Sequence, residues 1–483
     1  MKAKLEELFG ADVRSLAVLR IGLAVLLIVD LVQRSTDLLA HYTDAGLLSR
    51  TELVRLNGLR SLASVHFMSG AWELQALLFC VAGLCALALL AGYRTRLATV
   101  ACWLLFVSLN ARNPMVLYGA DVLIRVTLFW AMFLPLGARW SVDAVRAGTP
   151  QPHRSRVTSA GTVACLVQIA LVYWVTGVRK SGPEWWSEGS ALYYALSIDQ
   201  LATSLGHQLL EFPGLLKILT PLVLWLEIVG PFLLFSPVWT VWVRSLTVVA
   251  FILLQAGIGL TIHTGLFPWI SALVMVIFVP STVWDRLGIG EKAVQHVEAD
   301  VARPRALLSR LVAIGVVAML VYVILWNVAS LPSSPVKLPA PARALAVAVR
   351  LDQSWAMFAP APLKDDGWYV MPGRLRNGDI VDVFRGGGAV QWEKPPVVAD
   401  SYPNTRWRRY LMVLPYHLEY APGYARYLCR TWNTTHGEGQ RLEELEIVFV
   451  LERTLPDYRR SEPQKRSLYR HTCAENAAAP RRL

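Results

Sequence analysis

The chain has 483 residues, of which 54% are hydrophobic and only 17% are charged, a balance that excludes an ordinary soluble protein. Its formal net charge is +12, but no basic motif interleaved with aromatic residues indicates nucleic-acid binding. Composition therefore predicts a polytopic membrane protein whose basic residues act as topology anchors.

An α-helical membrane bundle is expected over residues 1–330. Apolar runs long enough to cross about 30 Å of hydrocarbon, or nearly so, recur at about nine places. The predicted spans are residues 16–32, 72–91, 97–109, 120–136, 160–178, 218–235, 241–262, 266–279 and 311–328. The third and eighth of these runs are short.

Basic residues gather in alternate loops of this layout, so that all of them fall on one side. They are Lys2, Lys4, Arg14, Arg94, Arg96, Arg139, Arg146, Arg154, Arg156, Arg286, Lys292, Arg303 and Arg305. By the positive-inside tendency this side is cytoplasmic, which places the N-terminus inside and, after nine spans, the C-terminus outside. The first apolar run is expected to act as an uncleaved signal anchor.

Two adjacent cations, Arg179 and Lys180, end the predicted span at 160–178. Moving an ammonium toward hydrocarbon costs about 3 kcal/mol or more, so a functional role is the first interpretation. Partial burial favours the neutral amine, which makes Lys180 a candidate base. The alternative is that both side chains snorkel to the interface as anchors, a role that suits the permanently charged Arg179 better.

Other charged residues fall within or at the edges of predicted spans, namely Arg20, Asp30, Asp121, Arg125 and Glu227. Ion pairing is the default expectation, because unpaired ions at membrane depth are unfavourable. Asp121 and Arg125 are four residues apart, so an intrahelical pair is one option. Glu227 has no evident partner in its own span; it is a candidate to meet Lys180 or a ligand, unless it satisfies a neighbouring helix.

After residue 330 the chain changes character. A linker at 331–335 precedes short β-prone runs that alternate with turn signals, which predicts a mostly β extracytoplasmic domain over residues 331–470. Asn377-Gly378 predicts a hairpin turn with two residues at positive φ between strands at 368–371 and 380–384. Residues 386–388 predict another turn, 410–414 and 446–451 further strands, and 471–483 a disordered tail.

The cysteines fit this layout. Cys80, Cys85, Cys102 and Cys165 lie within predicted spans, where cysteine acts as a small apolar filler. Cys429 and Cys473 lie in the external domain, where an oxidising compartment permits a disulfide; the sequence does not establish that their side chains approach. No Cys/His spacing indicates a metal site.

Five motifs occur in order along the predicted bundle. They are Arg20-Ile21-Gly22 with Asp30, Gly92-Tyr93-Arg94-Thr95-Arg96, Arg112-Asn113-Pro114 followed by Gly119-Ala120-Asp121, Gly177 to Lys180 with Trp186 and Gly189, and Gly265-Leu266-Phe267-Pro268-Trp269. Together they resemble the horizontally transferred transmembrane (HTTM) domain shared by vitamin K-dependent gamma-carboxylases and many bacterial membrane proteins, over roughly residues 10–330. Residues 353–362 resemble the tail motif of bacterial members, which implies a bacterial inner membrane.

The resemblance implies a lyase of carboxylase type with a reduced quinone, vitamin K-like or menaquinone-like, as its cofactor and no metal. In the carboxylases, the lysine matching Lys180 is the proposed base that deprotonates the quinol. Oxygenation then yields a strong base that removes a γ-proton from a substrate glutamate, and the carbanion captures carbon dioxide while an epoxide is left. Pro114 and Gln255 stand where the carboxylases have histidines. His263 lies near Gln255 and is a second catalytic candidate, the alternative being a structural or interfacial histidine.

The same resemblance suggests which residues contact the cofactor. The candidates are Arg179, Trp185, Trp186, Glu227, Asn113 and Tyr118. The two tryptophans would wall a quinone ring, unless they belong only to an interface belt.

Three functions stay open at this point. The first is a quinol-dependent membrane oxygenase or carboxylase with Lys180 as base, acting on an exported protein or peptide. The second is a non-enzymatic binding or maturation factor whose bundle binds membrane lipid. The third is a transporter, suggested only by the buried charges, since no inverted repeat is visible. Related proteins also suggest a thiol-disulfide oxidoreductase-like partner, and no Walker, Rossmann, HExxH or GxSxG signature supports other chemistry.

Overall fold

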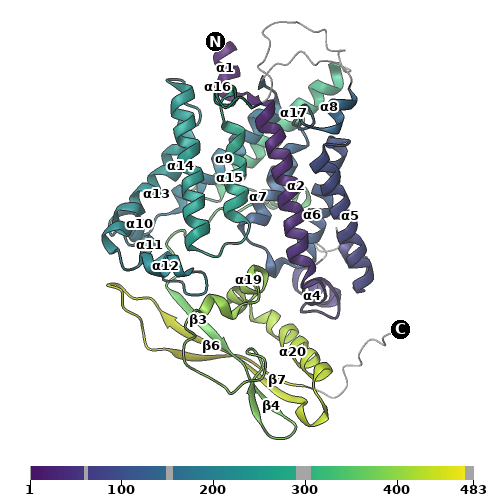
Figure 1. Cartoon of the computed structure of the whole chain (residues 1–483), viewed down its shortest axis with the longest axis vertical. Coiled ribbons are helices and arrows are strands. Elements are labelled where there is room, and N and C mark those ends of the chain that lie inside the picture. The colour runs from purple at the N-terminus through teal and green to yellow at the C-terminus, as the bar shows by residue number, and fades with distance from the viewer. Residues whose placement is uncertain (1, 59–63, 148–155, 290–305, 474–483) are drawn as a thin grey trace.

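The computed structural model describes residues 2–58, 64–147, 156–289 and 306–473. A helical bundle forms the N-terminal region, and a smaller C-terminal domain with an antiparallel sheet lies against one end of it (Figure 1). The C-terminal tail from residue 474, and with it Arg154, Lys292, Arg303 and Arg305 of the predicted topology anchors, lie outside the described residues.

Helices occupy all nine predicted places. Six of them, within the described residues, are long and apolar enough to cross a membrane: α2 (Val13–Ser35), α5 (Trp72–Ala91), α9 (Ala160–Arg179), α13 (Pro213–Leu233), α14 (Thr240–Thr261) and α17 (Ala306–Ala329). The other three are α6 (Thr95–Arg112), α7 (Gly119–Ala131) and α15 (Phe267–Met275), which continues into η4 (Val276–Phe278). These three are shorter or more polar than the six, and α2, α6, α7, α9 and α15 supply much of the buried apolar core.

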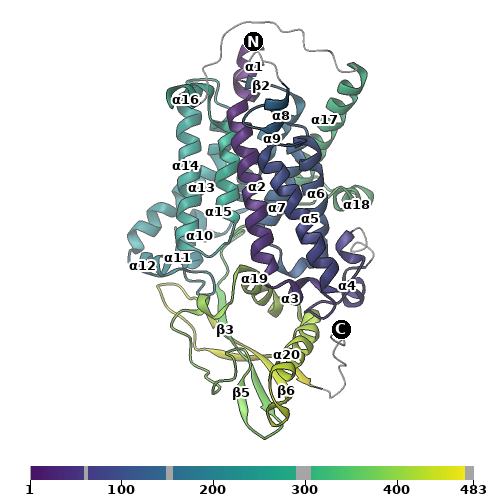
Figure 2. The same cartoon turned by 45° about the vertical axis from the view of Figure 1, so that its right-hand side comes forward.

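Short elements connect the long helices. They are α1 (Lys2–Phe9), β1 (Ala11–Asp12), α3 (Leu38–Tyr42), α4 (Arg50–Asn57), η2 (Val65–Phe67), η3 (Pro114–Val116), α8 (Val142–Arg146), β2 (Arg156–Val157), α10 (Pro183–Trp186), α11 (Ala191–Leu196), α12 (Ser204–Leu209), α16 (Ser281–Arg286) and α18 (Ala340–Ala348). The N-terminus, α8 and α16 lie at the end of the bundle opposite the C-terminal domain (Figure 2). The described basic loops therefore share one end, as predicted; that this end is cytoplasmic stays a prediction.

Gly92 shows how one motif closes a helix. It caps α5 in the left-handed conformation, with φ at 68°, which glycine adopts without a Cβ penalty. A Cβ atom there would lie 1.6 Å from Nη1 of Arg20, so glycine is also required by packing. Arg20 itself donates to the carbonyl of Trp140 at 2.5 Å and forms no ion pair within the described ranges, contrary to the default expectation.

The C-terminal domain combines one sheet with two substantial helices, and is thus less purely β than predicted. Its elements are β3 (Asp365–Val370), β4 (Pro372–Leu375), β5 (Ile380–Asp382), α19 (Thr405–Val413), α20 (Ala421–Thr435), β6 (Leu442–Arg453) and β7 (Gln464–Thr472), with 3-10 turns η5 (Val398–Ser401), η6 (Leu414–Tyr416), η7 (Leu418–Tyr420) and η8 (Glu438–Gln440). All strand pairs are antiparallel; β6 pairs with β3, β4 and β7, and β4 pairs with β5. The predicted strand at 446–451 is confirmed within β6.

The strand predicted at 410–414 is wrong. These residues are helical, because the side chain of Asn404 caps α19 by accepting from the backbone N–H groups of Arg406 and Trp407. Trp407, Tyr410 and Leu411 are buried at helical spacing, so their β propensity is overridden by packing.

The Asn377-Gly378 turn is confirmed, but it joins β4 to β5, whereas residues 368–370 belong to β3 and pair with β6. Of the two turn residues only Gly378 has a positive φ, at 91°. The turn at 386–388 is present, with Gly386 and Gly387 at positive φ. A disulfide joins Cys429 of α20 to Cys473 just after β7, which resolves the pairing that the sequence left open.

A buried cluster of four charges joins the two regions, and we name Asp30, Arg34, Asp121 and Arg406 the junction cluster. Arg406 of α19 donates to Asp30 at 2.6 Å and to Asp121 at 2.6 and 2.9 Å, while Arg34 donates to the same two carboxylates at 2.7 and 2.5 Å. Asp121 does not pair with Arg125, the option that their spacing left open; Arg125 instead forms an ion pair with Asp352 at 3.6 Å and donates to its backbone carbonyl. Buried charges are tolerated when they are paired in this way, so α19 is tied directly to α2 and α7.

Candidate functional site

A cavity of about 550 Å³ lies between α9, α13 and α14 and extends to α19 of the C-terminal domain. Its walls are mostly apolar, with leucine the commonest residue beside isoleucine, phenylalanine and methionine side chains. Leu222 of α13 and Leu253 of α14 line it and are 59% and 65% exposed. Two of its walls are therefore formed by helices that have the composition of membrane spans.

Lys180 lines this cavity. It follows the last residue of α9, where its backbone N–H donates to the carbonyl of Gly177 at 3.1 Å. Its Nζ donates to Oε2 of Glu227 in α13 and lies 4.3 Å from the ring centroid of Trp185. Both members of the ion pair are buried, with side-chain exposures of 3% and 7%.

Gly177 explains why α9 and α13 come close enough for this pair. A Cβ atom at Gly177 would lie 2.9 Å from Cγ1 of Ile228 and 3.1 Å from the backbone carbon of Glu227. Only glycine fits that approach without movement of α13. Gly177 thus allows the close packing of α9 against α13 that brings Lys180 of the same motif to Glu227.

Four further predicted site residues meet at this cavity. Trp185, Glu227, Tyr118 and His263 all line it together with Lys180. The hydroxyl of Tyr118 accepts from the backbone N–H of Leu266 at 3.1 Å. His263 follows the end of α14, and burial lowers the pKa of its imidazole, with the nearby Arg408 charge adding to the effect.

The other three predicted cofactor residues do not line the cavity. Arg179 donates to the carbonyl of Ser330 at 2.6 Å, and Asn113 donates to the carbonyl of His41 at 3.1 Å. Trp186 is 54% exposed and donates its ring N–H to the carbonyl of Lys180 at 2.7 Å. These three residues therefore support local structure, and Trp186 holds the backbone that carries the lysine.

Several polar groups of the cavity were not among the site residues predicted from the sequence. Gln255 lies on its wall and donates from Nε2 to the hydroxyl of Tyr173 at 3.2 Å, while its buried Oε1 finds no partner within the described residues. Arg408 and Arg409 of α19 line the end nearest the C-terminal domain. The helix cap at Asn404 was the signal that could have placed the arginines on one helix.

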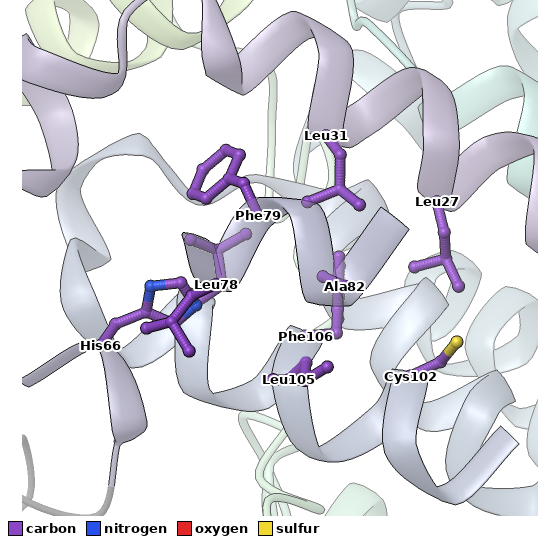
Figure 3. Close-up of a pocket in the computed structure, with 10 residues that line it drawn as sticks. Leu27, Leu31, His66, Leu78, Phe79, Ala82, Cys102, Leu105 and Phe106 are labelled. Carbon is purple, nitrogen blue, oxygen red and sulfur yellow. The ribbon is translucent and has the colours of Figure 1, made fainter. Parts of the chain in front are cut away.

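A second, much smaller pocket lies in another part of the bundle. It lies between α2, α5 and α6 beside His66, and encloses only about 20 Å³ (Figure 3). That volume holds about one water molecule. Nδ1 of His66 is 2.8 Å from Oε1 of Gln75, and burial lowers the pKa of this histidine to about 4, so its role is structural.

Among the described residues no group of three or more His, Cys, Asp or Glu side chains is placed to hold a metal ion. A family model described as the HTTM domain matches residues 10–284, which is more than half of the chain. Neither a curated protein nor a solved structure matches the chain.

Proposed function

Because this chain belongs to the HTTM-domain family, whose domain is found in gamma-carboxylase-like proteins, we propose that it binds a reduced quinone in the cavity and deprotonates it with Lys180. The observation that carries the proposal is the buried Lys180–Glu227 pair on the wall of an apolar cavity that is lined by two helices of membrane-span composition. Ionisable groups at such a place are functional by default.

The residues present fit a quinol. A cavity of about 550 Å³ falls inside the range of roughly 300 to 1,000 Å³ that small-molecule sites occupy, and like them it combines apolar walls with few polar groups. Oε1 of Gln255 is a buried acceptor without a partner in the described ranges, which suits a ligand hydroxyl because a buried polar atom left unpaired is costly. Trp185 offers an aromatic face beside Nζ of Lys180.

Proton transfer follows from the chemistry of the pair. In the ion pair, Nζ of Lys180 donates to Oε2 of Glu227. Transfer of this proton to Glu227 would leave a neutral amine and a neutral acid, and low dielectric lowers the cost of the transfer because it disfavours charged forms. The amine then accepts the proton of the ligand hydroxyl, and the resulting ammonium lies next to the new anion. When bound, a quinol would supply the acidic hydroxyl, and its reaction with molecular oxygen would give the epoxide and water.

The proposal stops short of glutamate carboxylation. Pro114 and Gln255 stand where the carboxylases have titratable histidines, and His263 is the remaining imidazole on the cavity wall. We place the C-terminal domain outside the cell, where an exported protein or peptide, or a thiol-disulfide oxidoreductase-like partner, can reach it. The positive-inside distribution of the loops supports that orientation.

The test compares variants in lipid nanodiscs supplied with reduced vitamin K and oxygen. Mass spectrometry measures retained quinone and its epoxide. The wild type is expected to form epoxide, and Lys180→Ala to lose activity by about 100-fold or more, as expected for removal of a general base, while it still retains quinone. Glu227→Gln is expected to lower the rate without emptying the cavity.

A matched pair of glycine variants tests the cavity itself. A Cβ at Gly257 of α14, which lines the cavity, meets no atom within 4 Å, and the same is true of Gly315 in α17, which does not line it. Gly257→Trp should fill the cavity and abolish quinone retention, and Gly315→Trp should change nothing. If the wild type retains quinone but forms no epoxide, the protein is a binding factor and not an enzyme. If the wild type retains no quinone, or if both glycine variants lose it equally, the proposal is refuted.

A further inference from the structure

The end of the cavity nearest the C-terminal domain carries positive charge. Arg408 and Arg409 of α19 line this end together with His263. Neither arginine has a carboxylate within ion-pair distance among the residues that the structure describes, although Arg406 on the same helix is fully paired with Asp30 and Asp121. Helix α19 thus presents one arginine that holds the domain and two that form no ion pair at contact distance.

Arg408 is the more enclosed of the two. Its residue is only 7% exposed; Nη2 donates to the carbonyl of Ala399 at 3.0 Å and the guanidinium lies 5.7 Å from the ring centroid of Tyr402. The buried Nε has no partner within the described ranges. Buried charges are normally paired, whereas the carboxylate that acts on this guanidinium, Asp400, does so from beyond ion-pair distance.

Arg409 and Thr264 complete the same end. Arg409 uses Nε to donate to the carbonyl of Leu117 at 2.8 Å and keeps exposed surface. Thr264, which also lines the cavity, has a buried hydroxyl oxygen without a described partner. Burial lowers the pKa of both Arg408 and Arg409, and the charges of Asp400 and Asp121 offset this effect only in part; the net direction is that expected of desolvated cations.

We propose that Arg408 and Arg409, with His263 and Thr264 beside them, form a binding site for an oxyanion, a carboxylate or a phosphate group. Planar guanidinium groups recognise such anions through paired, charge-assisted hydrogen bonds. The anion belongs either to a lipid headgroup whose chains lie in the cavity between α13 and α14, or to a small solute that enters from water.

This oxyanion site is separate from the Lys180–Glu227 pair, whose charges already neutralise each other. Gln255 and Thr261 of α14 both line the cavity and are six residues apart, which is about 9 Å along a helix. His263 follows beyond that point. The inference goes beyond the proposed function, because it requires no quinone and no base.

The experiment uses full-length protein in quinone-free nanodiscs and measures the midpoint of thermal unfolding by tryptophan fluorescence. One arm adds inorganic phosphate to phosphatidylcholine nanodiscs at constant ionic strength. The other arm replaces part of the phosphatidylcholine with phosphatidylglycerol. A bound anion stabilises the folded state by mass action, so a saturable rise in the midpoint is expected in one arm at least; a rise with phosphate identifies a free anion, and a rise with phosphatidylglycerol alone identifies a headgroup.

Variants decide whether the effect arises at the oxyanion site. Arg409→Gln removes one charge-assisted contact and is expected to weaken the apparent affinity by about 10-fold or more. Arg408→Gln should act in the same direction, but it is more buried, so Arg409→Gln keeps the test valid if Arg408→Gln fails to fold. Arg470→Gln, which removes the same charge from an exposed position on β7, should leave the affinity unchanged. No rise in either arm, or an equal loss in Arg409→Gln and Arg470→Gln, would overturn the proposal.

Discussion

Replacing Arg406 with methionine would test whether the junction cluster holds the C-terminal domain on the bundle. The guanidinium of Arg406 makes three contacts to the carboxylates of Asp30 and Asp121, at 2.6, 2.6 and 2.9 Å, and a fourth to the carbonyl of Val116 at 2.8 Å. All members of the cluster are buried. Methionine fills similar space but leaves two carboxylates facing Arg34 alone, so the cluster gains one uncompensated negative charge.

The expected cost is that of breaking a buried ion pair by removing one partner, about 3 to 5 kcal/mol. If the C-terminal domain separates from the bundle in response, the equilibrium between docked and undocked domain shifts toward the undocked state by roughly 100- to 5,000-fold, since 1.4 kcal/mol corresponds to a factor of ten. The assay is limited proteolysis in nanodiscs of the segment at 359–364, which connects residues packed in the bundle core to β3, together with thermal unfolding. Arg406→Met should make this segment more susceptible to cleavage and lower the unfolding midpoint.

Two matched variants make this reasoning refutable. Arg426→Gln breaks an ion pair across the same interface, with Glu52 at 2.6 Å, but Arg426 is 50% exposed, and an exposed pair is worth only about 0 to 1 kcal/mol. Adding Asp121→Asn to Arg406→Met restores neutrality and should recover much of the loss. Equal effects of Arg406→Met and Arg426→Gln, or no recovery in the double variant, would show that buried charge is not what joins the domains.

Two predictions concern the C-terminal domain. Burial and the neighbouring Asp199 charge raise the pKa of Asp366 to about 6, above the unfolded value near 4, so Asp366 contributes stability that is full below about pH 4 and lost as the pH rises through 6. Asp366→Asn should remove this pH dependence of the free energy of unfolding and raise stability at neutral pH by about 1 to 3 kcal/mol. The check is the unfolding midpoint measured against pH. The exposed control Asp457→Asn should keep the pH dependence of the wild type, and a pH dependence retained in Asp366→Asn would refute the assignment. Reducing the Cys429–Cys473 disulfide, which closes a loop of 44 residues, should lower the free energy of unfolding of the domain by up to about 4 kcal/mol. The variant Cys429→Ser should be as stable as the reduced wild type and should not respond to reductant. A reductant effect that persists in this variant would contradict the prediction.

Much of the architecture followed from local patterns. Helices occupy all the predicted places because the length of an apolar run is a property of neighbouring residues, and hydrocarbon thickness sets the length required. The turn at Asn377-Gly378 was likewise predictable from two adjacent residues. Lys180 stood out for the same reason, since a cation that ends an apolar run is visible without knowledge of its contacts.

The tertiary structure alone decided which distant groups meet. Arg406 pairs with Asp30 and Asp121 across nearly 400 and nearly 300 residues of chain, at separations of 376 and 285, and no local spacing relates them. The sequence suggested Arg125 for Asp121 because the two lie on one helix, yet packing placed a better-oriented guanidinium there. Arg408 came to the cavity only because α19 is a helix docked on the bundle. Hydropathy and turn propensity act between neighbours, whereas ion pairs and cavity walls depend on how whole elements pack, and that is why the span helices were predictable and half of the site was not.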